Sequence, residues 1–129
     1  MLKDEVEKYT KQKYNCSEAM LRGMNDYYQL QLDESALKLA GGLGGGLYSG
    51  DVCGCLTRAV MALGPMKIDD QAKATEGFTE RIQQFYEAFK QEYGSVDCHT
   101  LRQTQRDPVL GCAEFIARAA DFVEASLKK

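Results

Sequence analysis

Apolar residues recur at helical spacing along much of the chain. In the segment 70–93, Phe78, Ile82, Phe85 and Phe89 follow one another at intervals of four, three and four residues, which places them on one face of an α-helix. This aromatic stripe is typical of a hydrophobic core. The same period predicts further helices over segments 1–13, 16–28, 33–40, 51–64, 98–107 and 110–127.

No stretch alternates apolar and polar residues with the period of two that a half-buried β-strand requires. We therefore predict an all-α fold. At 129 residues the chain fits one domain that is large enough to bury a core without covalent cross-links. The prediction is a single helical domain over residues 1–129, a bundle of about five to seven helices that includes a glycine-rich loop.

Capping residues mark several of the helix ends. Asn15 and Glu18 form a capping box in Asn-Cys-Ser-Glu, and Asp33 is suited to cap the short helix that follows. Ser49 or Asp51 is predicted to cap the helix that ends at Gly64-Pro65.

The stretch 41–64, GGLGGGLYSGDVCGCLTRAVMALG, joins a glycine-rich loop to a helix. Six glycines between Gly41 and Gly50 could cradle a phosphate, but no Gly-Lys-Ser/Thr follows them, no GxGxxG pattern runs through them, and a helix rather than a strand precedes them. Nucleotide binding is therefore disfavoured. We interpret the loop as a flexible lead-in that lets helix ends and sulfur atoms approach one another.

The charge pattern limits the partners. The formal net charge is −3 and no cluster of Lys and Arg is present, which argues against binding nucleic acid. Residues 1–13 are charged throughout, unlike a signal peptide, and no apolar run approaches the length of a membrane span. We expect a soluble, cytoplasmic protein. In a reducing compartment, five cysteines are more typical of thiols, metal ligands or redox groups than of a disulfide framework.

The predicted positions of the cysteines suggest chemistry. All five fall within about one turn of a predicted helix start, where free amides and the helix dipole favour the thiolate. A thiolate is both a nucleophile and a ligand for soft metals. No CxxC or CxxCH motif identifies a particular metal or haem. The cysteines are Cys16, Cys53, Cys55, Cys98 and Cys112.

Two of these thiols are only two residues apart. On a regular helix, Cys53 and Cys55 would point about 200° apart, so they face one target only if the turn is irregular. His99, the single histidine, follows Cys98 and is an accessory candidate as a ligand or base. The residues considered as cofactor-binding candidates are Gly44, Gly45, Gly46, Cys55 and His99.

The order of Cys16, the glycine loop with Cys53, then Cys98 and Cys112 resembles a family of proposed redox-active proteins named for its C_GCAxxG_C_C cysteine pattern. The resemblance spans the chain from Asn15 to the final helix. It implies that Cys16, Cys53, Cys98 and Cys112 correspond to the family's four cysteines, as redox-active thiols or metal ligands.

The motif departs from the family pattern in this chain. In the register that we prefer, CGAxxG, Cys55 replaces Ala and Arg58 replaces the second Gly, so Cys55 is an extra thiol. Written as GCAxxG, the motif cysteine would be Cys55, with Leu56 in place of Ala.

Three hypotheses remain open from the sequence. The first is a thiol redox or metal-binding protein, such as an oxidoreductase or a redox carrier. Its four matched cysteines would either cycle between thiolate and disulfide with a redox partner protein or hold zinc or an iron–sulfur centre. The second is a small-molecule or cofactor carrier with the glycine loop as one wall. The third is a helical interaction protein with structural thiols.

Overall fold

The computed structural model describes residues 1–109 and 111–128. It is all-α, and the described residues form seven α-helices and no β-strand. Three short 3₁₀ or π turns lie between them: η1 (Gly41–Leu43), η2 (Gly46–Gly50) and η3 (Ala72–Ala74). The α-helices are α1 (Leu2–Lys11), α2 (Cys16–Tyr28), α3 (Glu34–Lys38), α4 (Gly54–Lys67), α5 (Phe78–Tyr93), α6 (Cys98–Gln105) and α7 (Ala113–Leu127).

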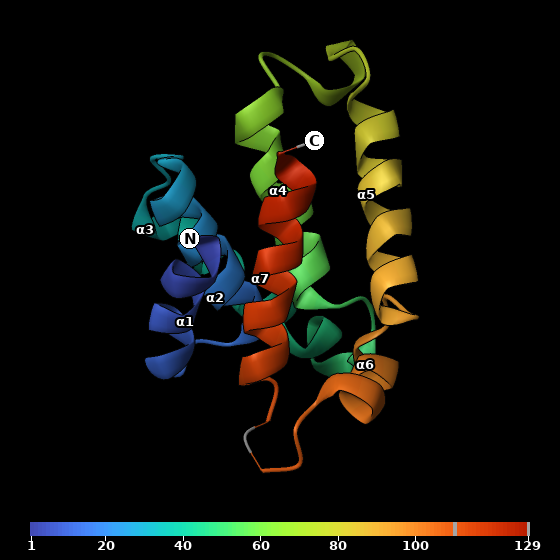
Figure 1. The fold of residues 1–129 in the computed structure, drawn as a ribbon. Coiled ribbons are helices and arrows are strands. Elements are labelled where there is room, and N and C mark those ends of the chain that lie inside the picture. The colour runs from blue at the N-terminus through green and yellow to red at the C-terminus, as the bar shows by residue number, and fades with distance from the viewer. Residues whose placement is uncertain (110, 129) are drawn as a thin grey trace.

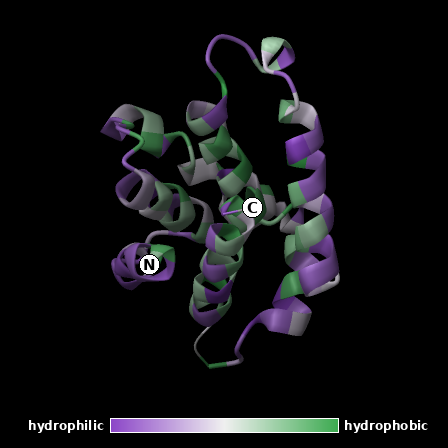
Figure 2. Cartoon of the chain, turned by 45° about the horizontal axis from the view of Figure 1, so that its top comes forward, coloured by the Kyte–Doolittle hydropathy of each residue, from purple (hydrophilic) through white to green (hydrophobic). Residues whose placement is uncertain are grey.

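Helices α1, α2, α4 and α7 contact one another and form the central bundle. In Figure 1, α7 and α4 stand side by side in the middle, α1 to α3 lie on one side, and α5 lies on the other. Figure 2 shows hydrophobic residues on the inward sides of these helices. Leu2, Met20, Met24 and Leu63 are fully buried there, so the predicted helical stripes do form the core.

Aromatic rings attach α5 to the bundle. Phe89 packs edge-on against Phe122 of α7 with ring centroids 5.9 Å apart, and Tyr93 packs against Phe115 at 5.0 Å. Of the predicted stripe, Phe85 and Phe89 are buried in the core, whereas Phe78 and Ile82 are only partly buried. Such aromatic pairs contribute about 0.5–1.5 kcal/mol each beyond the area that they bury.

Polar contacts fix the two ends of the chain. The buried Glu124 carboxylate on α7 accepts hydrogen bonds from the Leu2 amide at 2.9 Å and from the Tyr27 hydroxyl at 2.8 Å. These bonds satisfy one of the free amides at the start of α1 and lower the pKa of Glu124. Nearby, the Arg22 guanidinium donates two hydrogen bonds to Glu34, joining α2 to α3.

Several helix boundaries differ from the prediction. Helix α4 begins later than expected, with Cys53 rather than Ser49 or Asp51 as its N-cap, and it passes through Pro65 to Lys67. Pro65 has no N–H to donate to the carbonyl four residues before it, so α4 continues past it with one backbone hydrogen bond fewer. The cap of α2 by Asn15 and Glu18 is confirmed.

The long predicted helix over 70–93 is shorter in the structure. A 3₁₀ turn occupies Ala72–Ala74, and α5 starts after Gly77, whose φ of 78° is left-handed. The last helix starts at Ala113, and its predicted first residue, Leu110, lies outside the described residues. Tyr27, at the end of the predicted helix over 16–28, is 37% exposed, although its hydroxyl donates to the buried Glu124 carboxylate.

Candidate functional site: a cluster of five thiols

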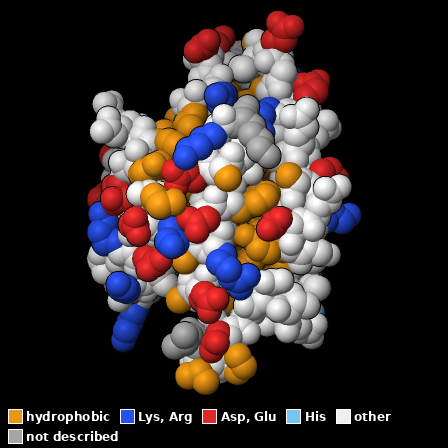
Figure 3. Space-filling view, viewed as in Figure 1, with side chains coloured by type: hydrophobic (Ala, Val, Ile, Leu, Met, Phe, Trp, Pro, Cys, Tyr) orange, Lys and Arg blue, Asp and Glu red, His pale blue; other side chains and the backbone are white. Residues whose placement is uncertain are grey.

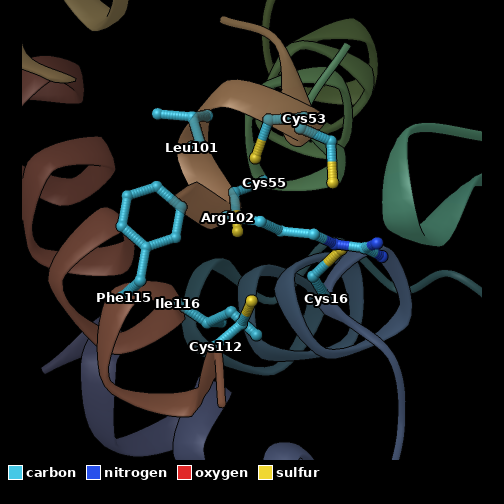
Figure 4. Close-up of a pocket in the computed structure, with 9 residues that line it drawn as sticks. Cys16, Cys53, Cys55, Leu101, Arg102, Cys112, Phe115 and Ile116 are labelled. Atoms are coloured by element: carbon cyan, nitrogen blue, oxygen red, sulfur yellow. The ribbon is translucent and has the colours of Figure 1, made fainter. Parts of the chain in front are cut away.

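The five cysteines all line one small hollow, together with Leu101, Arg102, Phe115 and Ile116. Its volume is about 30 Å³, room for one or two water molecules. Figure 4 shows the Cys16, Cys55 and Cys112 sulfur atoms directed into this space from three different helix starts. All five cysteines are free thiols. The structure thus brings together residues up to 96 positions apart, Cys16 to Cys112.

Each sulfur comes from the beginning of a helix. Cys16 is the first residue of α2 and Cys98 the first of α6. Cys53 and Cys112 occupy the N-cap positions of α4 and α7. The positive ends of four helix dipoles therefore meet at the hollow, an environment that favours negative charge on sulfur.

The starts of α4 and α6 are tied together by the backbone. The Cys53 amide donates to the Val96 carbonyl at 2.8 Å, and the Cys98 amide donates to the Asp51 carbonyl at 2.6 Å. These two bonds form an isolated antiparallel bridge between Val52 and Asp97. The bridge holds Cys53 and Cys98 at the same end of the bundle.

Cys53 and Cys55 face the same hollow because the turn between them is irregular. As the N-cap, Cys53 has φ −58° and ψ 132°, outside the helical region, so the 200° separation of a regular helix does not apply. Cys55 is fully buried and Cys53 is 5% exposed.

These two thiols differ in acidity. The Cys55 thiol and the backbone amides of Cys55 and Leu56 lie beside the Cys53 sulfur, and their hydrogen bonding lowers the pKa of Cys53 against the opposing effect of burial. None of these contacts has the geometry of a side-chain capping hydrogen bond at the start of α4. The same interaction and complete burial raise the pKa of Cys55 well above that of a free thiol. Cys53 is therefore the preferred thiolate of this pair.

Burial dominates at two of the remaining thiols. It raises the pKa of Cys16, although the Gly45 amide opposes it by hydrogen bonding to the sulfur. It also raises the pKa of Cys98, although the positive charge of Arg102 opposes it. Since negative charge on Cys53 or Cys112 also raises the pKa values of Cys16 and Cys98, the sulfurs are close enough to influence one another. One thiolate at a time is favoured.

The glycine loop shapes one side of the cluster. Gly45 and Gly46 have φ values of 58° and 62°, in the left-handed region that glycine tolerates best. A Cβ on Gly45 would lie 2.9 Å from an Arg102 Nη atom, and one on Gly44 would lie 2.4 Å from the Asn15 side chain. None of the three glycines lines the hollow, so they act here by letting neighbouring groups approach.

Other predicted residues lie elsewhere, and one unpredicted residue lies at the site. His99 is exposed, with its ring near the Gln103 amide at 3.5 Å, and it does not line the hollow. Arg102 does line it, and Figure 4 shows its side chain extending toward the side where Cys16 lies. The position of Arg102 one helical turn after Cys98 is the sequence signal that could have indicated it.

The metal hypothesis can be compared with this geometry. Thiolates suit zinc and iron–sulfur centres. However, within residues 1–109 and 111–128 no group of three or more His, Cys, Asp or Glu side chains is arranged to hold a metal ion. As they stand, the sulfurs line a shared hollow without forming a ligand set.

The fold and the site together define a helical thiol protein, with free cysteines from four helix starts around one hollow. The comparison with known families agrees with this description. A family model described as "Putative redox-active protein (C_GCAxxG_C_C)" matches residues 14–126. The chain belongs to this family. No curated protein and no solved structure gives a significant match, and no helix among the described residues has the length and apolar character needed to cross a membrane.

Proposed function

We propose that this protein is a thiol–disulfide redox protein in which Cys53 is the attacking thiol and another cysteine of the hollow completes an internal disulfide. The observation that carries the proposal is the convergence of five free thiols on one hollow, with only Cys53 shifted toward the thiolate by its neighbours. A lowered pKa raises the fraction of reactive thiolate at neutral pH.

The reaction exchanges a disulfide between substrate and protein. The Cys53 thiolate attacks one sulfur of a disulfide substrate, a small molecule or a partner protein, and forms a mixed disulfide. The other substrate sulfur leaves as a thiolate and takes up the proton that Cys53 gave up. A second cysteine then loses its proton and attacks the Cys53 sulfur, which releases the remaining half of the substrate as a thiol. Two protein thiols are oxidised to one disulfide, and one substrate disulfide is reduced to two thiols.

The resolving thiol is one of the other four that line the hollow. Cys16, Cys98 and Cys112 are, by the family resemblance, the matched positions, and Cys55 lies close enough to Cys53 to influence its pKa. Cys16 and Cys112 are only partly buried, so they give the cluster its contact with solvent. Disulfide formation requires Cβ atoms about 3.5–4.5 Å apart.

Two alternatives fit the geometry less well. A cofactor carrier needs a pocket of about 300–1,000 Å³, whereas the cysteine-lined hollow has about 30 Å³. A zinc or iron–sulfur protein needs a ligand set that the described residues do not present, so no step of the proposed reaction passes through a metal. A protein with purely structural thiols would keep all five inert to oxidants and disulfides.

Thiol counting under a controlled redox potential tests the proposal. The purified protein is equilibrated with mixtures of reduced and oxidised dithiothreitol, alkylated, and analysed by intact mass. We expect a two-electron transition from five to three alkylated thiols in the monomer, and loss of that transition in Cys53→Ser. Five alkylated thiols at every ratio, or oxidation only through dimers, would contradict it. Metal analysis of the same preparation checks the zinc and iron–sulfur alternative.

A further inference from the structure

Arg58 is a buried cation without a partner. Its side chain is 8% exposed, yet it makes no hydrogen bond or ion pair with any residue that the structure describes. Its Nε is cut off from solvent and unsatisfied. Burying a guanidinium N–H without an acceptor is costly, and burial lowers the pKa of Arg58 against the opposing effect of negative charge on Cys16. Buried Arg22, by comparison, has its carboxylate partner in Glu34.

A hollow lies beside this arginine, apart from the cluster of sulfurs. It has a volume of about 200 Å³ and is lined by Leu43, Leu47, Asp51, Val52, Thr57 and Arg58. Three of these residues are apolar, and Leu47 is 54% exposed at the rim. The space is several times larger than the hollow between the thiols, and it can hold a molecule of several heavy atoms.

The backbone around the hollow is strained. Leu47 and Tyr48 have φ values of 64° and 53° and continue the left-handed run that begins at Gly45. Left-handed conformations of such residues cost about 1 kcal/mol or more each and persist where surrounding structure requires them. Leu47, within this run, lines the hollow.

We propose that Arg58 and this hollow bind the carboxylate group of a small organic molecule. The guanidinium supplies the two-pronged donor that a carboxylate matches, and the apolar residues supply contact for the rest of the ligand. The Thr57 hydroxyl, which now donates to backbone carbonyls of its own helix, lies next to Arg58 as a second polar group.

The charge of the surroundings distinguishes carboxylate from phosphate. Asp51 also lines the hollow, and among the described residues its carboxylate accepts a hydrogen bond only from the amide of Val52. A phosphate dianion would be repelled by Asp51 more strongly than a single carboxylate would. The site therefore favours a monoanion.

Binding can be observed at Arg58 itself in the wild-type protein. Because Nε is buried, exchange of its N–H with water should be slow enough for the signal to be visible in a ¹H–¹⁵N NMR spectrum. Acetate is added in increasing amounts, and sodium chloride keeps the ionic strength constant. We expect a saturable shift of the Arg58 Nε–H signal, with acetate binding more tightly than inorganic phosphate. If acetate produces no saturable shift even at concentrations well above ~1 mM, the proposed site is wrong. Tighter binding of phosphate would overturn the assignment to carboxylates.

Variants locate the binding. Arg58→Met should weaken acetate binding about tenfold or more, read from the Thr57 backbone amide, and Asp51→Asn should tighten it. Arg118→Met is the matched control, since Arg118 is an exposed arginine that contacts Gln105 and Glu114, and it should leave binding unchanged. Equal binding by wild type and Arg58→Met would contradict the proposal. The two hollows share no lining residue, and acetate binding is measured in reduced protein without substituting a cysteine, so the two proposals fail separately.

Discussion

The Cys16 sulfur occupies the space into which a side chain at position 54 would extend. A Cβ on Gly54 would lie 2.8 Å from Cys16 Sγ and 3.1 Å from the Ser17 Cβ, closer than side chains pack. The absence of a side chain on Gly54 is what allows the start of α2 to meet the start of α4. Glycine at this position therefore brings Cys16 to the thiols of α4.

Gly54→Ala should displace Cys16 and disturb the cluster. We expect the free energy of unfolding to fall by about 1–3 kcal/mol, as for other overpacked sites, and the alkylation rate of Cys16 to change. Gly64→Ala, in the same helix, is the control because its Cβ would meet only Ile68 Cδ1 at 4.0 Å. It should stabilise the protein by about 0.5–1 kcal/mol. Equal effects of the two substitutions on urea unfolding would show that the close approach is unimportant.

Cys53→Ser should remove the redox transition while preserving the fold. Cys53 is the N-cap of α4, and serine is among the preferred N-cap residues. The loss of a nearly buried sulfur and the gain of a better cap should leave stability within about 1 kcal/mol of wild type. Thermal unfolding under reducing conditions measures this.

Cys55→Ser is the contrasting variant. Cys55 is fully buried, so a hydroxyl there should cost about 1–3 kcal/mol. If Cys53→Ser unfolds the protein and Cys55→Ser does not, Cys53 is a structural residue and the account of α4 is wrong.

The thiols should respond differently to pH. Hydrogen bonding to Cys53 lowers its pKa, so its alkylation rate should reach half of its maximum below the value of about 8.5 for a free cysteine. Burial raises the pKa of Cys98, so its half-maximum should lie above that value. Site-resolved mass spectrometry after timed alkylation in reducing buffer gives both profiles. A midpoint for Cys53 at or above that of Cys98 would contradict the predicted order.

Acid should weaken the contact between α7 and the start of α1. The pKa of Glu124 is lowered by the Leu2 amide and by Tyr27, so its stabilising effect is complete above the unfolded value of about 4.3 and is lost as pH falls through the lower folded value. Glu124→Gln should cost about 1–3 kcal/mol at pH 7 and less at low pH. Glu114→Gln, an exposed position on the same helix, should change little. A Glu124→Gln penalty that stays constant with pH would rule out this role.

The sequence predicts the helices correctly where the spacing of apolar residues is regular. It misplaces helix ends where a single residue determines the backbone conformation. The stripe of Phe78, Ile82, Phe85 and Phe89 identifies α5, but its start depends on the left-handed Gly77, which no periodicity encodes. Pro65 was expected to end α4, yet the helix continues to Lys67 because the residues beyond it still close the last turn, with the Ile68 amide donating to the Gly64 carbonyl.

The candidate site was predicted in part. The position of Cys16 at a helix start could be recognised from Asn15, which is the predicted cap and is the N-cap in the structure. The shared orientation of Cys53 and Cys55 could not be predicted from the sequence, because it depends on the non-helical backbone conformation of Cys53. Arg58 was not predicted as a functional residue, since burial without a hydrogen-bond partner arises only from tertiary packing. Arg102 was also missed, although it lies one helical turn after Cys98 in α6.

The surface is consistent with the charge pattern of the sequence. On the face shown in Figure 3, acidic and basic side chains are interspersed, and no large basic area is visible. With a formal net charge of −3, this face offers little attraction for a polyanion. In the proposed reaction, a disulfide-bearing partner would instead have to reach the nearly buried Cys53 sulfur, beside the more exposed Cys16 and Cys112.

Disulfide mapping of the oxidised wild-type protein tests the central claim most directly. The protein is equilibrated with oxidised dithiothreitol, blocked by alkylation, digested without reduction, and analysed by mass spectrometry. The account predicts that Cys53 is recovered in a disulfide with another of the five cysteines of the same chain. If Cys53 is recovered as an alkylated free thiol and the other four cysteines are also free of disulfides, the account is contradicted.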